Sequence, residues 1–271
     1  MFNIDGIILS ISKLFNDLNY EIGDIVNIIT QPQSAMPGLW NMIEGIFNCL
    51  LPIGYSLLAL FFMLDLLNNT ITFRIAKIEN IIKIVIRVVL AKVIMQSSFV
   101  ILEQIYYSVS DIISSVYASP GTIQNIVDIA ELKTQLEAMK FMELIAFQMQ
   151  FMPIKLIMQI LKVLIEVICY GRIIELYIFT ALAPLPLSTM VSGEYNNIAK
   201  RFVQHYISVC LQGLIIMIAC MSFSGIANTI LVSTATSSAE ISMWGTITAC
   251  VVLLLVLTKA STWAKQIVGV N

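Results

Sequence analysis

Residues 47–67 read FNCLLPIGYSLLALFFMLDLL, and this stretch decides what kind of fold the chain can have. About 20 consecutive, mainly apolar residues are enough for an α-helix to cross the hydrocarbon core of a bilayer. The stretch reaches that length, and Pro52 lies near its start, where early helical positions do not need a backbone N–H. We therefore predict a transmembrane helix here and interpret the rest of the chain as part of a protein embedded in a bilayer.

The composition of the whole chain supports this interpretation. Of its 271 residues, 58% are hydrophobic and only 12% are charged, and the mean hydropathy is +0.89. An ordinary soluble domain carries about 25% charged residues, so this chain cannot cover a soluble surface. Helices satisfy their own main-chain hydrogen bonds in lipid. The composition therefore predicts an all-α, polytopic membrane helical bundle.

The further apolar stretches occupy residues 84–106, 144–190, 206–230 and 243–257. In the first of these, Arg87 and Lys92 are expected to extend toward one membrane interface. The longest of them exceeds the length of one simple crossing, and Gly171, Pro184 and Pro186 interrupt it. We expect the two prolines to break its helix, because proline cannot continue the helical hydrogen-bond ladder.

The lysines and arginines predict how the chain is oriented, since they are retained on the cytoplasmic side of short loops. Residues 1–46 contain a single lysine, whereas residues 68–92 contain five lysines and arginines. Lys200 and Arg201 follow the longest apolar stretch, and residues 229–242 contain neither residue type. This alternation predicts five crossings, with the amino terminus outside and the carboxyl terminus in the cytoplasm. It requires the longest stretch to cross an odd number of times rather than to turn as a hairpin.

The predicted organisation has two parts. Residues 1–46 form an external or interfacial segment, and residues 47–271 form the transmembrane helical domain, with an external loop at about 106–143. Apolar residues recur at helical spacing from Ile4 to Leu18, which predicts an amphipathic helix. It either lies in the membrane interface or packs against a neighbouring subunit. Asp5 stands where a signal peptide would have its basic region, so we expect this segment to stay in the mature protein.

A polar stripe within the longest apolar stretch is the first candidate site. Gln148, Lys155 and Lys162 recur every seven residues and Glu166 follows four later, which places them on one narrow face of a helix. Charge at bilayer depth is costly unless it faces a water-filled path or a partner. The stripe is therefore a candidate channel lining. In the alternative interpretation, Lys162 pairs with Glu166 and the stripe extends into headgroups or solvent.

A second set of residues is predicted to be structural. Arg172 and Glu175 are three residues apart in an apolar helix and can pair locally as a clamp. Gly213 permits close helix approach, and the preceding Gln212 can hydrogen-bond a neighbouring helix. The residues assigned to the clamp or to helix packing are thus Arg172, Glu175, Pro184, Pro186, Gln212 and Gly213.

The residues that carry most enzyme and metal chemistry are scarce. The five cysteines show no CxxC spacing, and the chain has one histidine, His205. A metal centre or a general nucleic-acid surface is therefore not supported. A membrane-embedded enzyme would need a cluster of nucleophile, base or metal ligands. We expect no catalytic residue, no bound metal and no cofactor.

Several motifs resemble one family of membrane proteins. They are the segments Tyr170–Tyr177 (YGRIIELY) and Ala183–Met190 (APLPLSTM), the opening Met1–Gly6 (MFNIDG), Leu211–Leu214 (LQGL) in the fourth stretch, and the tail from Lys259 to Lys265. Together they resemble the TrbL-like polytopic subunits of Gram-positive conjugation machineries. Members of that family are similarly interpreted as having five spans and an external amino terminus.

The resemblance implies a non-enzymatic channel or scaffold subunit of a conjugative type IV secretion system in the cell membrane of a Gram-positive bacterium. Its implied partners are the secretion ATPase, the DNA-coupling protein, a bitopic assembly factor, membrane lipid and, transiently, the relaxase-DNA substrate. One five-span chain cannot enclose a path for a macromolecule, so we expect a ring-like homo-oligomer, possibly a pentamer. The alternative is a stand-alone secondary transporter or an ion-conducting membrane protein, although no internal repeat of the transporter kind is visible.

Overall fold

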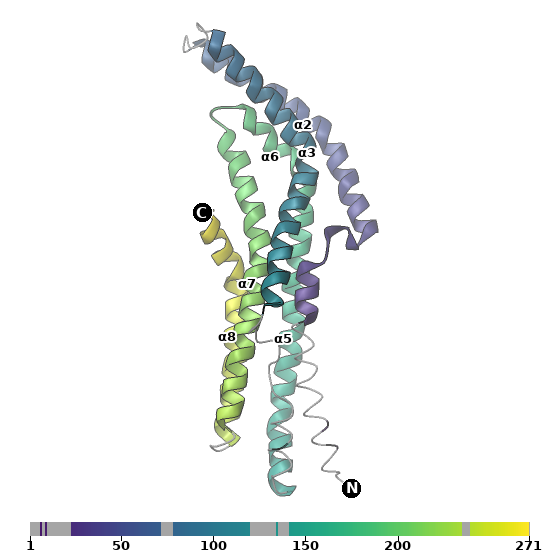
Figure 1. The fold of residues 1–271 in the computed structure, drawn as a ribbon, viewed down its shortest axis with the longest axis vertical. Helices are drawn as coiled ribbons and strands as arrows, with labels where there is room; N and C mark the ends of the chain where they lie inside the picture. Colours follow the sequence, from purple (N-terminus) through teal and green to yellow (C-terminus); the bar gives the residue numbers. More distant parts are fainter. Residues whose placement is uncertain are drawn as a thin grey trace. The chain divides into compact units, whose positions relative to one another are not determined.

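The computed structural model describes residues 6, 9, 23–71, 78–119, 134, 141–234 and 239–270. Every regular element in these residues is helical (Figure 1). A short helix over residues 23–30 precedes η1 (Gln33–Ala35), α2 (Pro37–Ile71), α3 (Ile78–Tyr117), α5 (Phe141–Leu182), α6 (Pro184–Leu187), η3 (Ser188–Val191), α7 (Asn196–Thr234) and α8 (Ala239–Val268). Apart from Gly6 and Leu9, the amphipathic helix predicted from Ile4 to Leu18 lies outside the described residues.

Four helices in the described part of the chain are long and apolar enough to cross a membrane. They comprise Pro37–Asn68, Ile82–Tyr117, Asn196–Phe223 and Cys250–Val268. These segments correspond to the four predicted spans that lie before and after the longest apolar stretch. That stretch folds into α5, whose crossing of the membrane stays a prediction, as does the orientation of the chain.

The helices extend beyond the predicted spans. α2 begins at Pro37, so Pro52 lies in the helix interior rather than near its start, as the sequence had indicated. α3 ends at Tyr117, and the first part of the loop predicted over 106–143 is therefore helical. The reason is that an apolar face continues past the predicted end, with Val109 and Ile113 buried. The sequence did not predict this continuation, because the composition of these residues resembles that of a loop.

The longest apolar stretch is interrupted at its prolines but not at its glycine. α5 runs through Gly171 without a turn, so the chain forms no hairpin there. It ends at Leu182, and Pro184 opens α6. A proline ring clashes with the carbonyl four residues earlier, which explains why the helix stops here. Ser188 Oγ donates to the Leu185 carbonyl at 2.6 Å and Thr189 Oγ1 donates to the Pro186 carbonyl at 2.7 Å.

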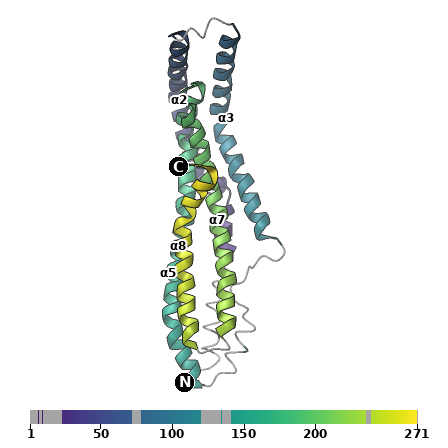
Figure 2. The same ribbon diagram turned by 90° about the vertical axis from the view of Figure 1, so that its left-hand side faces the viewer.

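The chain divides into two compact units. Unit 1 comprises Met1–Thr30, Asp111–Gly171 and Gln212–Ser261, and unit 2 comprises Gln31–Ser110, Arg172–Leu211 and Thr262–Asn271. In unit 1, the parts of α5, α7 and α8 run lengthwise alongside one another (Figure 2). In unit 2, α6 and η3 pack on α2. The division predicted between residues 46 and 47 separates an external segment from a transmembrane domain. It concerns placement in the membrane and stays a prediction.

A small apolar core holds α2, α3 and η3 together in unit 2. Leu58, Ala91, Met95 and Val191 are buried in contact with one another, and partly buried side chains such as Tyr55 pack around them. By contrast, most of the large apolar side chains on the outer faces of α2 and α3 are exposed. This inside-out pattern is expected of helices whose outer faces contact lipid or other membrane proteins.

Candidate functional site

A break in the helical chain at residues 31–36 lies in unit 2. Pro32 has no backbone N–H to donate, and the residue before Pro37 is disfavoured from the helical region, so the helix over 23–30 cannot continue directly into α2. Only the short η1 forms between them. Main-chain polar groups that are removed from water need hydrogen-bond partners within the protein. The carbonyls of this segment therefore need donors.

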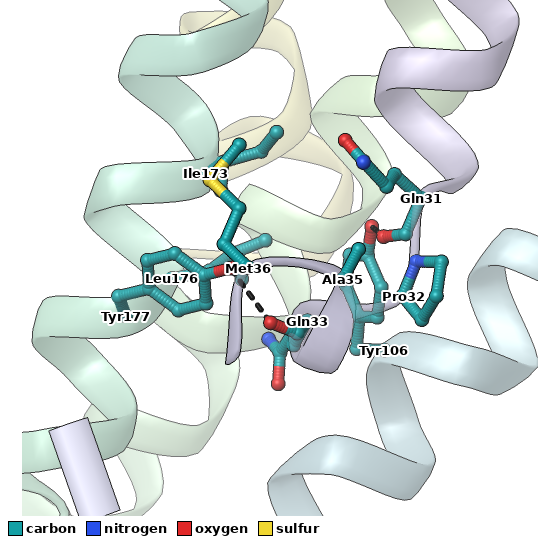
Figure 3. A pocket seen from close by; sticks show the side chains of 9 residues that line it. All are labelled: Gln31, Pro32, Gln33, Ala35, Met36, Tyr106, Ile173, Leu176 and Tyr177. Atoms are coloured by element: carbon teal, nitrogen blue, oxygen red, sulfur yellow. Dashed lines mark hydrogen bonds between the residues drawn. The ribbon is translucent and has the colours of Figure 1, made fainter. Parts of the chain in front are cut away.

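Three tyrosines from three helices provide the hydrogen bonds around this break. Tyr106 of α3 donates its hydroxyl to the Gln31 carbonyl at 2.6 Å, and Tyr177 of α5 donates to the Gln33 carbonyl at 2.8 Å (Figure 3). The Gln33 side-chain amide donates to the Tyr206 hydroxyl of α7 at 3.2 Å. Tyr206 in turn donates to the Leu102 carbonyl at 3.0 Å. The break thereby links α3, α5 and α7.

The space left at this break is too small for an organic ligand. A cavity of about 10 Å³ is lined by Gln31, Pro32, Gln33, Ala35, Met36, Tyr106, Ile173, Leu176 and Tyr177 (Figure 3). A cavity of this size can hold about one water molecule. Gln33 is 2% exposed, and its Oε1 has no hydrogen-bond partner among the described residues. The arrangement is suited to holding helices together rather than to binding a substrate.

Arg172, one of the residues predicted to be structural, binds the main chain of α7. It is 2% exposed, and it donates Nε to the Val209 carbonyl at 2.9 Å and Nη2 to the Cys210 carbonyl at 3.2 Å. Its guanidinium carbon also lies 5.9 Å from the centre of the Tyr106 ring, within the range of a cation–π contact. Glu175 is half-buried, and its pairing with Arg172 stays a prediction.

The other residues predicted to be structural lie in α6 and in α7. Pro184 is buried and opens α6, and Pro186 lies within the same short helix. Gln212 is 8% exposed and Gly213 is buried, both within α7. Their burial agrees with a packing role, but the helix contacts predicted for Gln212 and Gly213 stay predictions.

The predicted polar stripe lies on α5. Of its members, the structure describes the side chains of Lys162, which is exposed, and Glu166, which is half-buried. Gln148 and Lys155 are in the same helix, but their side chains are outside the described part of the structure. Whether the stripe lines a path stays a prediction.

A polar cluster around Asp65 of α2 was not predicted from the sequence. Asp65 is 7% exposed. Its Oδ1 accepts the Gly193 N–H at 3.1 Å, and its Oδ2 lies 3.8 Å from Nη1 of Arg87 in α3. Arg87 lies between this carboxylate and the Val191 carbonyl, which accepts from Nη1 at 3.5 Å. Its extension toward a membrane interface stays a prediction.

The cluster fixes the turn between η3 and α7. Besides the bond from Gly193, the Asn68 side chain donates to Glu194 Oε2 at 3.3 Å, and the rings of Phe61 and Tyr195 lie 5.6 Å apart. A lone carboxylate in an apolar span indicates that a partner exists. The sequence could not identify that partner, because the turn follows more than a hundred residues later.

α6 packs closely on α2 at Gly54. A Cβ placed on Gly54 would lie 3.0 Å from Pro184 Cβ, from the Pro184 carbonyl oxygen and from Met95 Sδ. Main-chain atoms of Pro184 cannot move aside cheaply, so a larger residue would force α6 away from α2. The glycine thus permits this close contact.

We expect Gly54→Ala to lower the stability of the protein by about 1–3 kcal/mol, the usual range for overpacking. Gly45→Ala is the matched control, because it lies in the same helix and has open space where its Cβ would be. Since alanine favours helix more than glycine does, this control should be neutral or slightly stabilising. Thermal unfolding of the detergent-purified proteins measures both. Equal melting temperatures for the two variants would show that the Gly54 contact is unimportant.

These features define a polytopic helical membrane protein whose buried polar groups hold its helices together. Among the described residues, no group of three or more histidine, cysteine, aspartate or glutamate side chains could hold a metal ion. Residues 18–184, more than half of the chain, match the family described as TrbL/VirB6 plasmid conjugal transfer like protein. The chain belongs to this family and is a membrane component of conjugal transfer, or type IV secretion, systems. No curated protein and no solved structure matches it.

Proposed function

We propose that this chain is a non-enzymatic channel or scaffold subunit that helps to move a relaxase-DNA complex across the cell membrane. The observation that supports this most is the family match over residues 18–184, which includes the whole of α2, α3 and α5. That region contains both the helix break and the polar stripe. Chemistry on the substrate would be left to other subunits of the machine.

The proposed arrangement has five membrane crossings. α5 is the third of them, between the two pairs of candidate spans, with the amino terminus outside and the carboxyl terminus in the cytoplasm. Several copies form a ring, possibly a pentamer, because a single chain of five spans cannot enclose a macromolecular path. The ring works with the secretion ATPase, the coupling protein and a bitopic assembly factor in a Gram-positive cell membrane.

Crosslinking of DNA in transit tests this proposal. Donor cells are mixed with recipients, treated with formaldehyde, and the epitope-tagged protein is precipitated and probed for the transferred strand. We expect strand-specific DNA to be recovered with the protein in a donor that has all other transfer subunits. Donors without the relaxase are the control and should give none. If transfer proceeds but the strand is never recovered with this chain, it acts as a scaffold away from the path.

A further inference from the structure

Three polar side chains form a row along α3 inside its candidate membrane span. They are Lys92, Gln96 and Glu103, which follow one another at intervals of four and seven residues. With about 3.6 residues per turn, these intervals keep the three side chains on one face of the helix. Lys92 and Gln96 are exposed in the folded chain, and Glu103 is half-buried. We call these three residues the α3 row.

Contacts with α2 show where the α3 row lies in unit 2. The Lys92 ammonium lies 5.9 Å from the centre of the Tyr55 ring of α2. Phe99, which follows Lys92 by seven residues on the same face of α3, has its ring centre 5.3 Å from that of Phe47 in α2. The row therefore follows the edge along which α3 meets α2.

This edge lies at the depth of the hydrocarbon core if α2 and α3 cross the membrane as proposed. Lys92 belongs to the apolar stretch 84–106, and Tyr55 belongs to the apolar stretch 47–67. At 1.5 Å per residue, each of the two residues is about 12 Å or more from both ends of its stretch. The core is about 30 Å thick. The ammonium, which lies over the Tyr55 ring, is then inside the core rather than at its surface.

The contacts within the chain do not compensate for a charge at this depth. A lysine at the centre of a membrane helix costs at least about 2.5–3.5 kcal/mol, whereas a cation–π contact returns about 0.5–2 kcal/mol. Lys92 has no acidic partner within 4 Å in the part of the chain that the structure describes. The exposed amide of Gln96 adds a second polar group one turn further along α3. Lipid tails cannot hydrogen-bond either group, so both need water or a polar partner.

We propose that the α3 row faces a water-filled space within the membrane. Polar side chains at membrane depth are tolerated where they line such a space. One lysine and one glutamate leave the row without net charge, so its occupant is water rather than the polyanionic substrate itself. The proposal deepens the proposed function and rests on the crossings of α2 and α3 that it contains. It makes the edge between these two helices part of the lining of an aqueous path.

Thiol labelling in membrane vesicles tests the α3 row. Lys92→Cys and Gln96→Cys are made separately in a chain that carries Cys49→Ser, since Cys49 is exposed and the other native cysteines are buried. Vesicles of both orientations, from donor cells with all other transfer subunits, receive a membrane-impermeant methanethiosulfonate that bears a sulfonate. The matched controls are Leu90→Cys and Ile101→Cys, which are exposed and apolar at similar depths but lie about half a helix turn away from the row. We expect the two row positions to react on the order of tenfold faster, because the reactive thiolate forms in water and not in apolar surroundings.

The outcomes separate the α3 row from the proposed channel. If all four positions resist the reagent in vesicles and react only after denaturation, lipid or protein covers the row and the proposal is wrong. Equally fast reaction at all four would also overturn it, since the row would then differ in no way from the apolar side of α3. Labelling does not depend on DNA transfer. A reactive row in a protein that never contacts the transferred strand would keep the hydrated face and reject only the channel, whereas recovery of the strand with an unreactive row would reject only the hydrated face.

Discussion

Arg172→Ala is expected to lower the stability of the protein by about 3–5 kcal/mol, the range for truncating a large buried side chain. Arg172 is 2% exposed, and the substitution would leave a cavity where its side chain fills the space beside α7. It would also remove the hydrogen bonds to the carbonyls of Val209 and Cys210 and the contact with the Tyr106 ring. We expect low abundance in the membrane and early thermal unfolding of the purified protein.

Two further variants identify what Arg172 stabilises. Arg172→Lys keeps the charge but not the planar fork that reaches two carbonyls at once, so we expect only partial recovery. Glu175→Ala should have a small effect, because Glu175 is half-buried and Arg172 donates to main-chain carbonyls of α7. A loss with Glu175→Ala as large as with Arg172→Ala would show instead that the two side chains form the decisive pair.

The double variant Lys155→Glu, Lys162→Glu is expected to abolish DNA transfer while the protein still accumulates. If the stripe on α5 faces the path in the assembled ring, each copy contributes two ammonium groups to it. Rings of cationic side chains favour a polyanion without reading its sequence. Reversing their charge would repel DNA at every copy of the subunit. Conjugation frequency and membrane abundance, measured in the same donor cells, check this result.

The matched control replaces the same two lysines with glutamine. This variant removes the attraction without adding repulsion, so transfer should fall less than with glutamate. Normal transfer in both double variants would place the stripe away from DNA. A failure of both to accumulate would make it structural, in agreement with the alternative in which Lys162 pairs with Glu166 along the helix.

Much of the helical fold could be predicted from local sequence. Apolar length predicted the four helices that can cross the membrane, and Pro184 marked where α5 ends. The helix boundaries were less predictable, because the residues that extend α2, α3 and α7 resemble loops in composition and only a few of them, such as Ile43, Val109 and Ala199, are buried. The chain was predicted not to turn back at Gly171, and α5 is continuous there. A glycine only permits a turn, and the apolar residues around it keep α5 continuous.

The candidate site was predictable only in part. Arg172 was predicted to be structural, with Glu175 as its partner, because a charge in an apolar helix needs partners wherever it lies. Its acceptors were not predicted, since main-chain carbonyls of α7 carry no sequence signature. Tyr106, Tyr177 and Tyr206 were missed for a similar reason. The sequence does not show which tyrosine of a membrane helix will place its hydroxyl beside a non-helical segment whose carbonyls need donors.

The sequence by itself determined that the helices suit a membrane environment and how many main apolar helices there are. Both depend on the local length and hydropathy of each stretch. The tertiary structure alone decided which polar groups meet. It brought Gln31 and Gln33 against tyrosines of three helices, and Asp65 against a turn far along the chain. Such pairings depend on the packing of distant segments, in which each buried polar atom must find a donor or an acceptor.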